Sequence, residues 1–239
     1  MVIPESWHEL KVYWEKLQDY VVVRRSIRGK ELLFFVEPTR EGWFHVCTIQ
    51  ELTKLLTLCD DKALSSFDFI ALRQPTRKQR ILCPVWGRAA FAFDLGNHRG
   101  RAIVIEAQTL RPYLWSSRSL DPEMSRELAR LELDGHSITT NKRSIGISPT
   151  PESMRATILY RTLLHEIGHH VDYQGYKERA DGCSAWDRRP KREREDFAHR
   201  YAHETASTLR RAGHIPFSAP ATADTIRDDG LDPAWFMSA

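Results

Sequence analysis

The sequence predicts an α+β protein, and three observations lead to that expectation. Runs of β-branched and aromatic residues fill much of the first 105 positions, and two long helical patterns follow between residues 150 and 213. The chain has 239 residues, with 41% hydrophobic and 28% charged, which is the composition of a globular protein with a substantial core. We expect an N-terminal α/β subdomain over residues 1–60, a core over 61–215 and an irregular C-terminal tail over 216–239.

The N-terminal sixty residues predict a helix, a small sheet and a second helix. Apolar residues recur at helical spacing from Trp7 to Tyr20, which predicts the first helix. Thr48 and Glu51 form a T-x-x-E capping box, which predicts that a short helix begins at Thr48. Between the two helices, three strand-like runs predict an antiparallel meander: 21–23, 32–36 and 43–46.

The middle of the chain predicts the main sheet and one more helix. Asp121 and Pro122 have the residue types of an N-cap and a first helical position, and Gly135 follows the expected end at Leu133. A short strand is expected at 144–148, directly before Pro149. Strand candidates separated by turn residues form the expected main sheet: 67–72, 89–93 and 102–105.

Two long helices are expected in the last third. Thr150 as N-cap and Pro151 at the first helical position begin the first, which runs unbroken to about Tyr173. The second begins near Pro190 and ends before Gly213. The polar stretch between them, 174–189, is predicted to be a surface loop.

Charge and composition exclude several classes of protein. The net charge of +3 is a mild basic bias, and the four cysteines include no C-x-x-C pair, so neither a zinc ribbon nor a dense disulfide framework is indicated. No apolar run reaches the length of a membrane helix, and no signal-peptide core follows Met1, so we expect a cytoplasmic protein with no membrane partner. Three basic segments, 77–80, 99–101 and 188–194, leave an acidic substrate or nucleic acid as a partner, with solvated loop charges as the simpler interpretation.

The segment from His165 to His169 reads H-E-x-x-H and carries the predicted chemistry. Residues four apart on a helix differ by about 40° around its axis, so His165 and His169 face the same way and can hold Zn²⁺. Glu166 lies about 100° round the axis, from where it can reach a metal-bound water without being a ligand. Asp172 and Ile158 fall on the same face as His165. The alternative is a pair of solvated or hydrogen-bonded surface histidines.

A catalytic zinc needs a third protein ligand, and Glu195 is the best candidate. The metzincin pattern fails because Asp172 and Gly175 occupy its glycine and third-histidine positions. Glu195 lies on the apolar stripe of the second long helix, where small alanines would allow close approach of the first. The alternative to a ligand role is that Glu195 is a carboxylate stabilised by the helix dipole near a helix N-terminus. Three alternative ligands stay open: Asp196, His199 and His203.

The quoted residues resemble a known group of enzymes. The run His165–Tyr173, HEIGHHVDY, and the run Glu195–Tyr201, EDFAHRY, resemble zinc peptidases of the anthrax lethal factor type and, more loosely, the Mlc titration factor peptidases. The likeness covers residues 150–213. It implies His165, His169 and Glu195 as zinc ligands, Glu166 as general base, and a zincin-like fold in which a twisted sheet lies above the active-site helix.

One position departs from the lethal-factor pattern. That type is expected to carry a tyrosine seven residues before the glutamate ligand, and this chain has Arg188 there. The residue that stabilises the tetrahedral intermediate is therefore open among five candidates: Tyr173, Tyr176, Arg188, Tyr201 and His203.

These features predict a zinc-dependent endopeptidase that hydrolyses a protein or peptide amide bond. Zinc would lower the pKa of its water toward about 7, and Glu166 would carry the proton to the leaving nitrogen. Asp172 is placed to orient a ligand imidazole or to pair with a nearby base, and His199 to orient a ligand in the same way. A peptide would add as a strand at a sheet edge, for which 102–105 is the candidate. The alternatives are a regulatory or DNA-associated protein with a structural or vestigial metal site, and a delivered toxin or effector protease.

Overall fold

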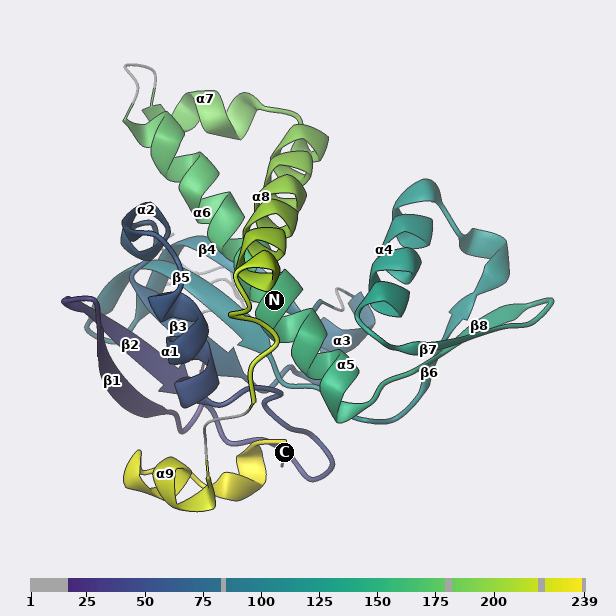
Figure 1. The fold of residues 1–239 in the computed structure, drawn as a ribbon, viewed down its shortest axis with the longest axis horizontal. Coiled ribbons are helices and arrows are strands. Elements are labelled where there is room, and N and C mark those ends of the chain that lie inside the picture. The colour runs from purple at the N-terminus through teal and green to yellow at the C-terminus, as the bar shows by residue number, and fades with distance from the viewer. Residues whose placement is uncertain (1–16, 83–84, 179–181, 219–221, 238–239) are drawn as a thin grey trace, which may run out of the picture.

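The computed structural model describes residues 17–82, 85–178, 182–218 and 222–237, and in these ranges the protein is α+β as predicted (Figure 1). Residues 17–20 precede the first strand and are not helical, and the rest of the helix expected at 7–20 lies outside the described ranges. None of the described helices combines the length and apolar character needed to cross a bilayer.

The main sheet has the order β1-β2-β3-β5-β4 and is mixed. The expected antiparallel meander is confirmed for the pair 21–23 and 32–36 and is wrong for 43–46. β1 and β2 form a hairpin, β2 and β3 are parallel, β3 and β5 are parallel, and β4 runs antiparallel to β5. Residues 43–46 contribute only isolated bridges, through Phe44 and His45. The strands are β1 Val21–Ile27, β2 Lys30–Val36, β3 Phe69–Arg73, β4 Gly87–Leu95 and β5 His98–Glu106.

The edge strand differs from the expectation. Residues 102–105 belong to β5, which lies between β3 and β4, so they are interior and not an edge. The reason is a tight turn at Gly96, where φ is +60°, which folds β4 and β5 into a hairpin with β4 outermost. The exposed edge on this side of the sheet is therefore β4.

Alternate residues of each central strand enter two different apolar clusters. Phe34, Ile70 and Ile103 join the cluster that the helices cover, whereas Phe35 and Phe69 join the cluster on the opposite face, against Leu17 and Tyr20. Burial on both faces explains why these strands read as continuous apolar runs. The residues on the two sides of position 60 share this sheet and the first cluster.

Local capping signals fix the first helices. Thr48 caps α1 (Ile49–Thr57), and its capping box with Glu51 is present as predicted. Asp60 caps the short α2 (Asp61–Ser65), which was not predicted. α3 (Arg77–Leu82) is also additional, and it begins soon after Pro75. Cys47 and Cys59 are buried free thiols in this region.

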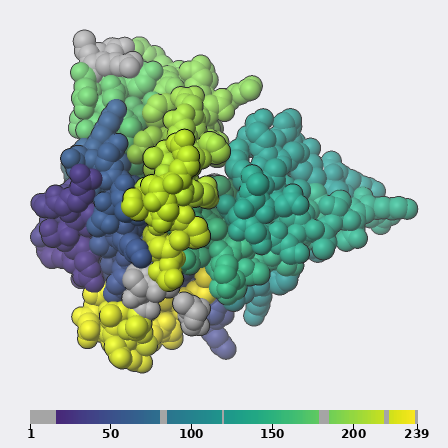
Figure 2. Space-filling model, in the orientation of Figure 1, coloured from purple at the N-terminus to yellow at the C-terminus, as the bar shows by residue number. Residues whose placement is uncertain are grey.

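A lobe of residues 113–148 projects from the main body (Figures 1 and 2). It contains a three-stranded antiparallel sheet in the order β6-β8-β7, comprising β6 Tyr113–Ser116, β7 Ser137–Thr140 and β8 Ser144–Ser148. The short 3-10 turn η3 (Ser117–Ser119) leads to α4 (Pro122–Leu133), which Asp121 caps as predicted. Leu131, Ile145 and Ile147 form the core of this lobe.

The first long helix runs from Pro151 to Lys177 but is not α-helical throughout. It consists of α5 (Pro151–Arg155), a π-helical segment η4 (Ala156–Leu163) and α6 (Leu164–Lys177). The wider π turn changes the angular phase of the residues before it, so Ile158 is fully buried in the main core and does not share the face of His165.

The second long helix, α8 (Lys191–Arg211), ends before Gly213 as predicted, with φ of +70° at that glycine. The loop expected at 174–189 is wrong in part, because α6 extends to Lys177 and α7 (Gly182–Arg188) follows. After Phe217 the described tail contains α9 (Ala223–Asp228) and the 3-10 turn η5 (Pro233–Trp235), and it packs on the core through Phe236.

Candidate metal centre

Two imidazole rings from α6 meet on one side of the helix, as the spacing predicts. The Nε2 atoms of His165 and His169 are 3.1 Å apart, and the ring planes are nearly perpendicular at 87°. Both side chains are largely buried, with 13% and 12% of their surface exposed. Each ring nonetheless lines an open cleft. They are therefore not solvated surface histidines.

Glu195 brings the third donor from α8. Its Oε2 atom lies 3.4 Å from His165 Nε2 and 3.5 Å from His169 Nε2. Ligands bound tetrahedrally to zinc at 2.0–2.1 Å stand about 3.3 Å from one another. The donor set and its spacing therefore fit a three-ligand zinc site.

The other candidate ligands on α8 differ in position. The carboxylate of Asp196 is exposed and lies 3.7 Å from Arg192 Nε on the helix surface. His203 is exposed as well. His199 is closer, because one of its ring nitrogens lies within 4.8 Å of donor atoms of both His165 and Glu195. Its ring contacts that of His165 at a centroid distance of 4.3 Å, with the ring planes tilted by 42°.

The close packing of α6 and α8 brings the donors together. A Cβ atom at Gly168 would lie 3.1 Å from Ala198 Cα and 3.2 Å from Tyr201 Cβ, so a larger residue there would press α8 outward. Ala198, Ala202 and Ala206 are buried on the facing stripe, as expected from the pattern of small residues. Glu195 lies one turn before Ala198 on the same stripe, and this packing carries it to the histidines.

Glu166 lies beside the three donors, between α6 and β4. Its side chain is buried, and the backbone N–H of Ala89 on β4 donates a hydrogen bond to its carboxylate. Burial raises its pKa above the ordinary value, although the nearby imidazoles act in the opposite direction. Gly87 gives β4 the room to pass, since a Cβ there would lie 2.7 Å from Thr162 Cγ2.

The donors influence one another electrostatically. Burial raises the pKa of Glu195, but its hydrogen bonds with His165 and His169 outweigh burial and hold the pKa well below its usual range. Burial alone would lower the pKa of His169, but its hydrogen bond to Glu195 outweighs burial, so the pKa is raised above its ordinary value. The carboxylate is thus ionised at neutral pH, which is the form that binds a cation. His165 Nδ1 is buried without a hydrogen-bond partner among the described residues.

Asp172 pairs with a nearby base, which is the second of its two predicted roles. Its Oδ2 atom accepts hydrogen bonds from Trp186 Nε1 at 2.9 Å and from Arg189 Nη1 at 2.5 Å. Asp172 therefore anchors α7 and the segment after it onto α6. This anchoring explains why a helix forms where a loop was expected, since both donors lie within 182–189.

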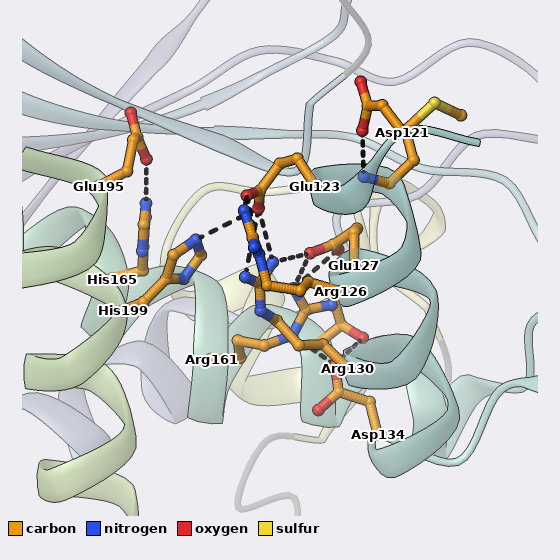
Figure 3. A network of polar contacts seen from close by, with 12 residues as sticks. Asp121, Glu123, Arg126, Glu127, Arg130, Asp134, Arg161, His165, Glu195 and His199 are labelled. Atoms are coloured by element: carbon orange, nitrogen blue, oxygen red, sulfur yellow. Dashed lines mark hydrogen bonds and ion pairs between the residues drawn. The ribbon is translucent and has the colours of Figure 1, made fainter. Parts of the chain in front are cut away.

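His199 connects the centre to the lobe (Figure 3). Its Nε2 atom lies 4.0 Å from Glu123 Oε1 at the start of α4. Burial lowers the pKa of His199 to about 4, and the neighbouring His165 acts in the same direction, so the ring is neutral at pH 7. The neutral ring of His199 is in contact with Glu123 but does not form an ion pair with it. From Glu123, ion pairs run through the lobe and back to the long helix, through Arg126, Arg130, Glu127, Arg161 and Asp134.

The cleft at the centre has a volume of about 350 Å³ and a cationic rim. Arg88, Lys191 and Arg194 line it, and none of the five predicted oxyanion donors is among its described lining residues. Tyr201, for example, is turned against Gly168 in the helix interface. The basic run before Glu195 was the available signal for Lys191 and Arg194, because both precede Glu195 by at most about one helical turn. Arg88 could not be predicted as a cleft residue without knowing that β4 is the edge strand.

No protein-family model, curated protein or solved structure matches this chain. The conclusion about function therefore rests on the geometry of the centre and on the chemistry of its residues.

Proposed function

We propose that the protein is a zinc-dependent endopeptidase with a zincin-like arrangement of edge strand, active-site helix and ligand helix. The observation that carries the proposal is the triangle of donor atoms from His165, His169 and Glu195, with sides of 3.1, 3.4 and 3.5 Å at the wall of an open cleft. Three protein ligands beside an open cleft are the arrangement of catalytic zinc sites, whereas structural sites are closed by four.

The chain's own residues supply the rest of the chemistry. Zinc held by these three donors would provide an acidified water and polarise the amide carbonyl. Glu166 would accept the proton of the nucleophile and deliver it to the leaving nitrogen. Its raised pKa makes the protonated carboxyl a more accessible state than for an exposed glutamate, and the Ala89 N–H fixes the carboxylate toward the cleft.

The substrate would bind as an added strand on the outer edge of β4, on either side of the Ala89 N–H that donates to Glu166. This edge lines the cleft at Gly87, Ala89 and Phe91, so a peptide paired with it would pass directly over Glu166. Lys191 and Arg194, which line the same cleft from α8, are the cationic groups available to a developing oxyanion. They would take the role for which the lethal-factor type is expected to use a tyrosine.

Metal analysis combined with three variants tests the proposal. We expect one zinc per chain and hydrolysis of fluorescently labelled casein. Glu166→Gln should keep the zinc and lose activity by about 10²- to 10⁴-fold, the usual contribution of a general base. Glu195→Ala should lose zinc, while Asp196→Ala, the exposed neighbour on the same turn, should keep it.

Two results would contradict the assignments. Stoichiometric zinc with an unchanged rate in Glu166→Gln would reject the catalytic role. Wild-type zinc affinity in Glu195→Ala would reject Glu195 as the third ligand, and the same titration on His199→Ala would then show whether that imidazole replaces it.

A further inference from the structure

A second cavity, of about 630 Å³, lies between the main sheet and the lobe. This volume is within the usual range for small-ligand sites of about 300–1,000 Å³. Its walls include three of the seven tryptophans in the chain. Its aromatic lining residues are Trp43, Trp86, Tyr113 and Trp115, and its arginines are Arg80 and Arg111.

The aromatic walls form an apolar surface with no covering segment among the described residues, and the Arg80 guanidinium lies over the Trp43 ring at 4.6 Å from its centroid. Trp43, Trp86, Tyr113 and Trp115 are each only partly buried. Leu114, which also lines the cavity, is 72% exposed. Apolar side chains gathered in this way on a soluble domain mark a binding surface. Large flat rings of this kind favour an aromatic or bulky aliphatic group.

The cavity is also bordered by one edge strand of the lobe. Tyr113, Leu114 and Trp115 are consecutive residues of β6, and all three line it. β6 pairs with β8 on one side and is an edge strand of the described three-stranded sheet on the other. Free backbone donors and acceptors of an edge strand suit an extended peptide. A nucleic acid has no matching row of backbone amides, so the strand edge favours a peptide.

The charge around the cavity indicates which residue type would stand next to the aromatic residue of such a peptide. Arg80 and Arg111 are exposed at its rim. The acidic residue in the lining, Glu106, is buried and already paired with Arg73 and Arg88. The accessible charge at the rim is therefore positive. An acidic side chain beside the aromatic one fits this distribution.

The cavity adjoins the cleft of the metal centre. Val85 lines both. It precedes Gly87 by two residues, which is about 7 Å along an extended chain. A peptide paired with β4 above Glu166 would therefore reach the cavity about two to four residues from the bond opposite the metal centre.

We propose that this cavity is a specificity subsite that takes a large aromatic side chain adjacent to an acidic residue, about two to four positions from the scissile bond. The subsite rests on the proposed peptidase function for its role in cleavage. The binding of the aromatic and acidic pair does not rest on it, and the two are tested separately.

A peptide selection on the full chain tests the binding. A displayed library of random dodecapeptides is selected on Glu166→Gln protein, and the affinity of a synthetic consensus peptide is measured by calorimetry. We expect enrichment of Trp, Tyr or Phe next to Asp or Glu. Trp115→Ala should weaken the consensus peptide at least tenfold. The exposed Arg111→Glu, which should not disturb folding, should weaken it about fivefold, while Arg118→Glu, exposed on the same segment but outside the cavity, should not.

The opposite outcomes overturn the subsite. These are a selection with no aromatic and acidic preference, equal affinity in wild type and Arg111→Glu, or displacement of the peptide by an oligothymidylate that binds more tightly. Zinc-loaded wild-type protein should cut the consensus peptide two to four residues from its aromatic residue. If the peptide is bound but not cut while casein is hydrolysed, the subsite is wrong and the peptidase stands. If neither is cut, the peptidase itself is rejected.

Discussion

Replacing Gly168 by alanine is expected to separate metal binding from folding. The added Cβ would lie 3.1 Å from Ala198 Cα, 3.2 Å from Ala198 O and 3.2 Å from Tyr201 Cβ. Two of these three atoms belong to the backbone of α8, which cannot rotate away as a side chain can. The helix itself must therefore move outward, and Glu195 lies on it one turn before Ala198.

The size of the effect follows from the contacts. Carbon atoms in favourable contact are about 3.5–4.0 Å apart, so α8 must shift by about 0.4 Å. Zinc ligands tolerate about 0.2 Å of displacement, so we expect zinc affinity to fall about 10- to 100-fold. Overpacking costs about 1–3 kcal/mol, and alanine regains about 1 kcal/mol of helix propensity. The free energy of unfolding without metal should fall by about 0–2 kcal/mol.

Competition with a chromophoric chelator measures the zinc affinity, and urea unfolding of the metal-free protein measures stability. Gly175→Ala is the matched control, because it lies on the same helix and its added Cβ would have no atom within 4 Å. The control should gain up to about 1 kcal/mol of stability and keep its zinc affinity. Equal zinc affinity in the two variants would refute the argument that helix contact positions Glu195.

Three further changes test other parts of the structure. Gly87→Ala should push β4 away from Glu166 and lower casein hydrolysis about 10- to 100-fold with zinc content unchanged, and a lost zinc would contradict this account. Burial lowers the pKa of His45 to about 4, against about 6.5 when unfolded, so the unfolded state binds more protons between these values. The free energy of unfolding should therefore fall by up to about 3 kcal/mol as the pH is lowered from about 6.5 to 4. Urea unfolding of His45→Asn should show a weaker dependence of this free energy on pH, and an unchanged dependence would refute the contribution of His45. Asp172→Asn should weaken the bond from Arg189 and cost about 2 kcal/mol, with a shift in Trp fluorescence, whereas an unaltered spectrum would show that α7 is held otherwise.

Helix boundaries were predictable from the sequence because their determinants are local. Thr48 accepts from the backbone of Glu51, and Asp121 accepts from that of Met124, each only three residues away. The meeting of His165, His169 and Glu195 was predictable for a related reason. Helical phase depends on spacing along one helix, and neither α6 nor α8 contains a break between the residues that matter.

The order of strands was not predictable, for a physical reason. β3 and β5 are buried on both faces, so their sequences carry no alternation that distinguishes an interior strand from an edge. The helix α7 depends on Asp172, which is distant along the chain from Trp186 and Arg189. The contact between His199 and Glu123 depends on how the lobe lies against α8, which periodicity does not encode.

The centre contains arrangements that a site serving stability alone would avoid. Glu166 is buried as a desolvated carboxyl, and His165 Nδ1 is buried without a hydrogen-bond partner among the described residues. Each carries a free-energy cost of about 1–3 kcal/mol or more, and replacing either side chain by an apolar one would remove it. Yet the surrounding contacts are well formed, since Gly168, Ala198 and the Ala89 N–H hold these groups in place. A preorganised catalytic site holds such energetically costly groups in place by close packing around them. The unfavourable burial of Glu166 and His165 within well-packed surroundings therefore favours a functional reason for these residues over a structural one.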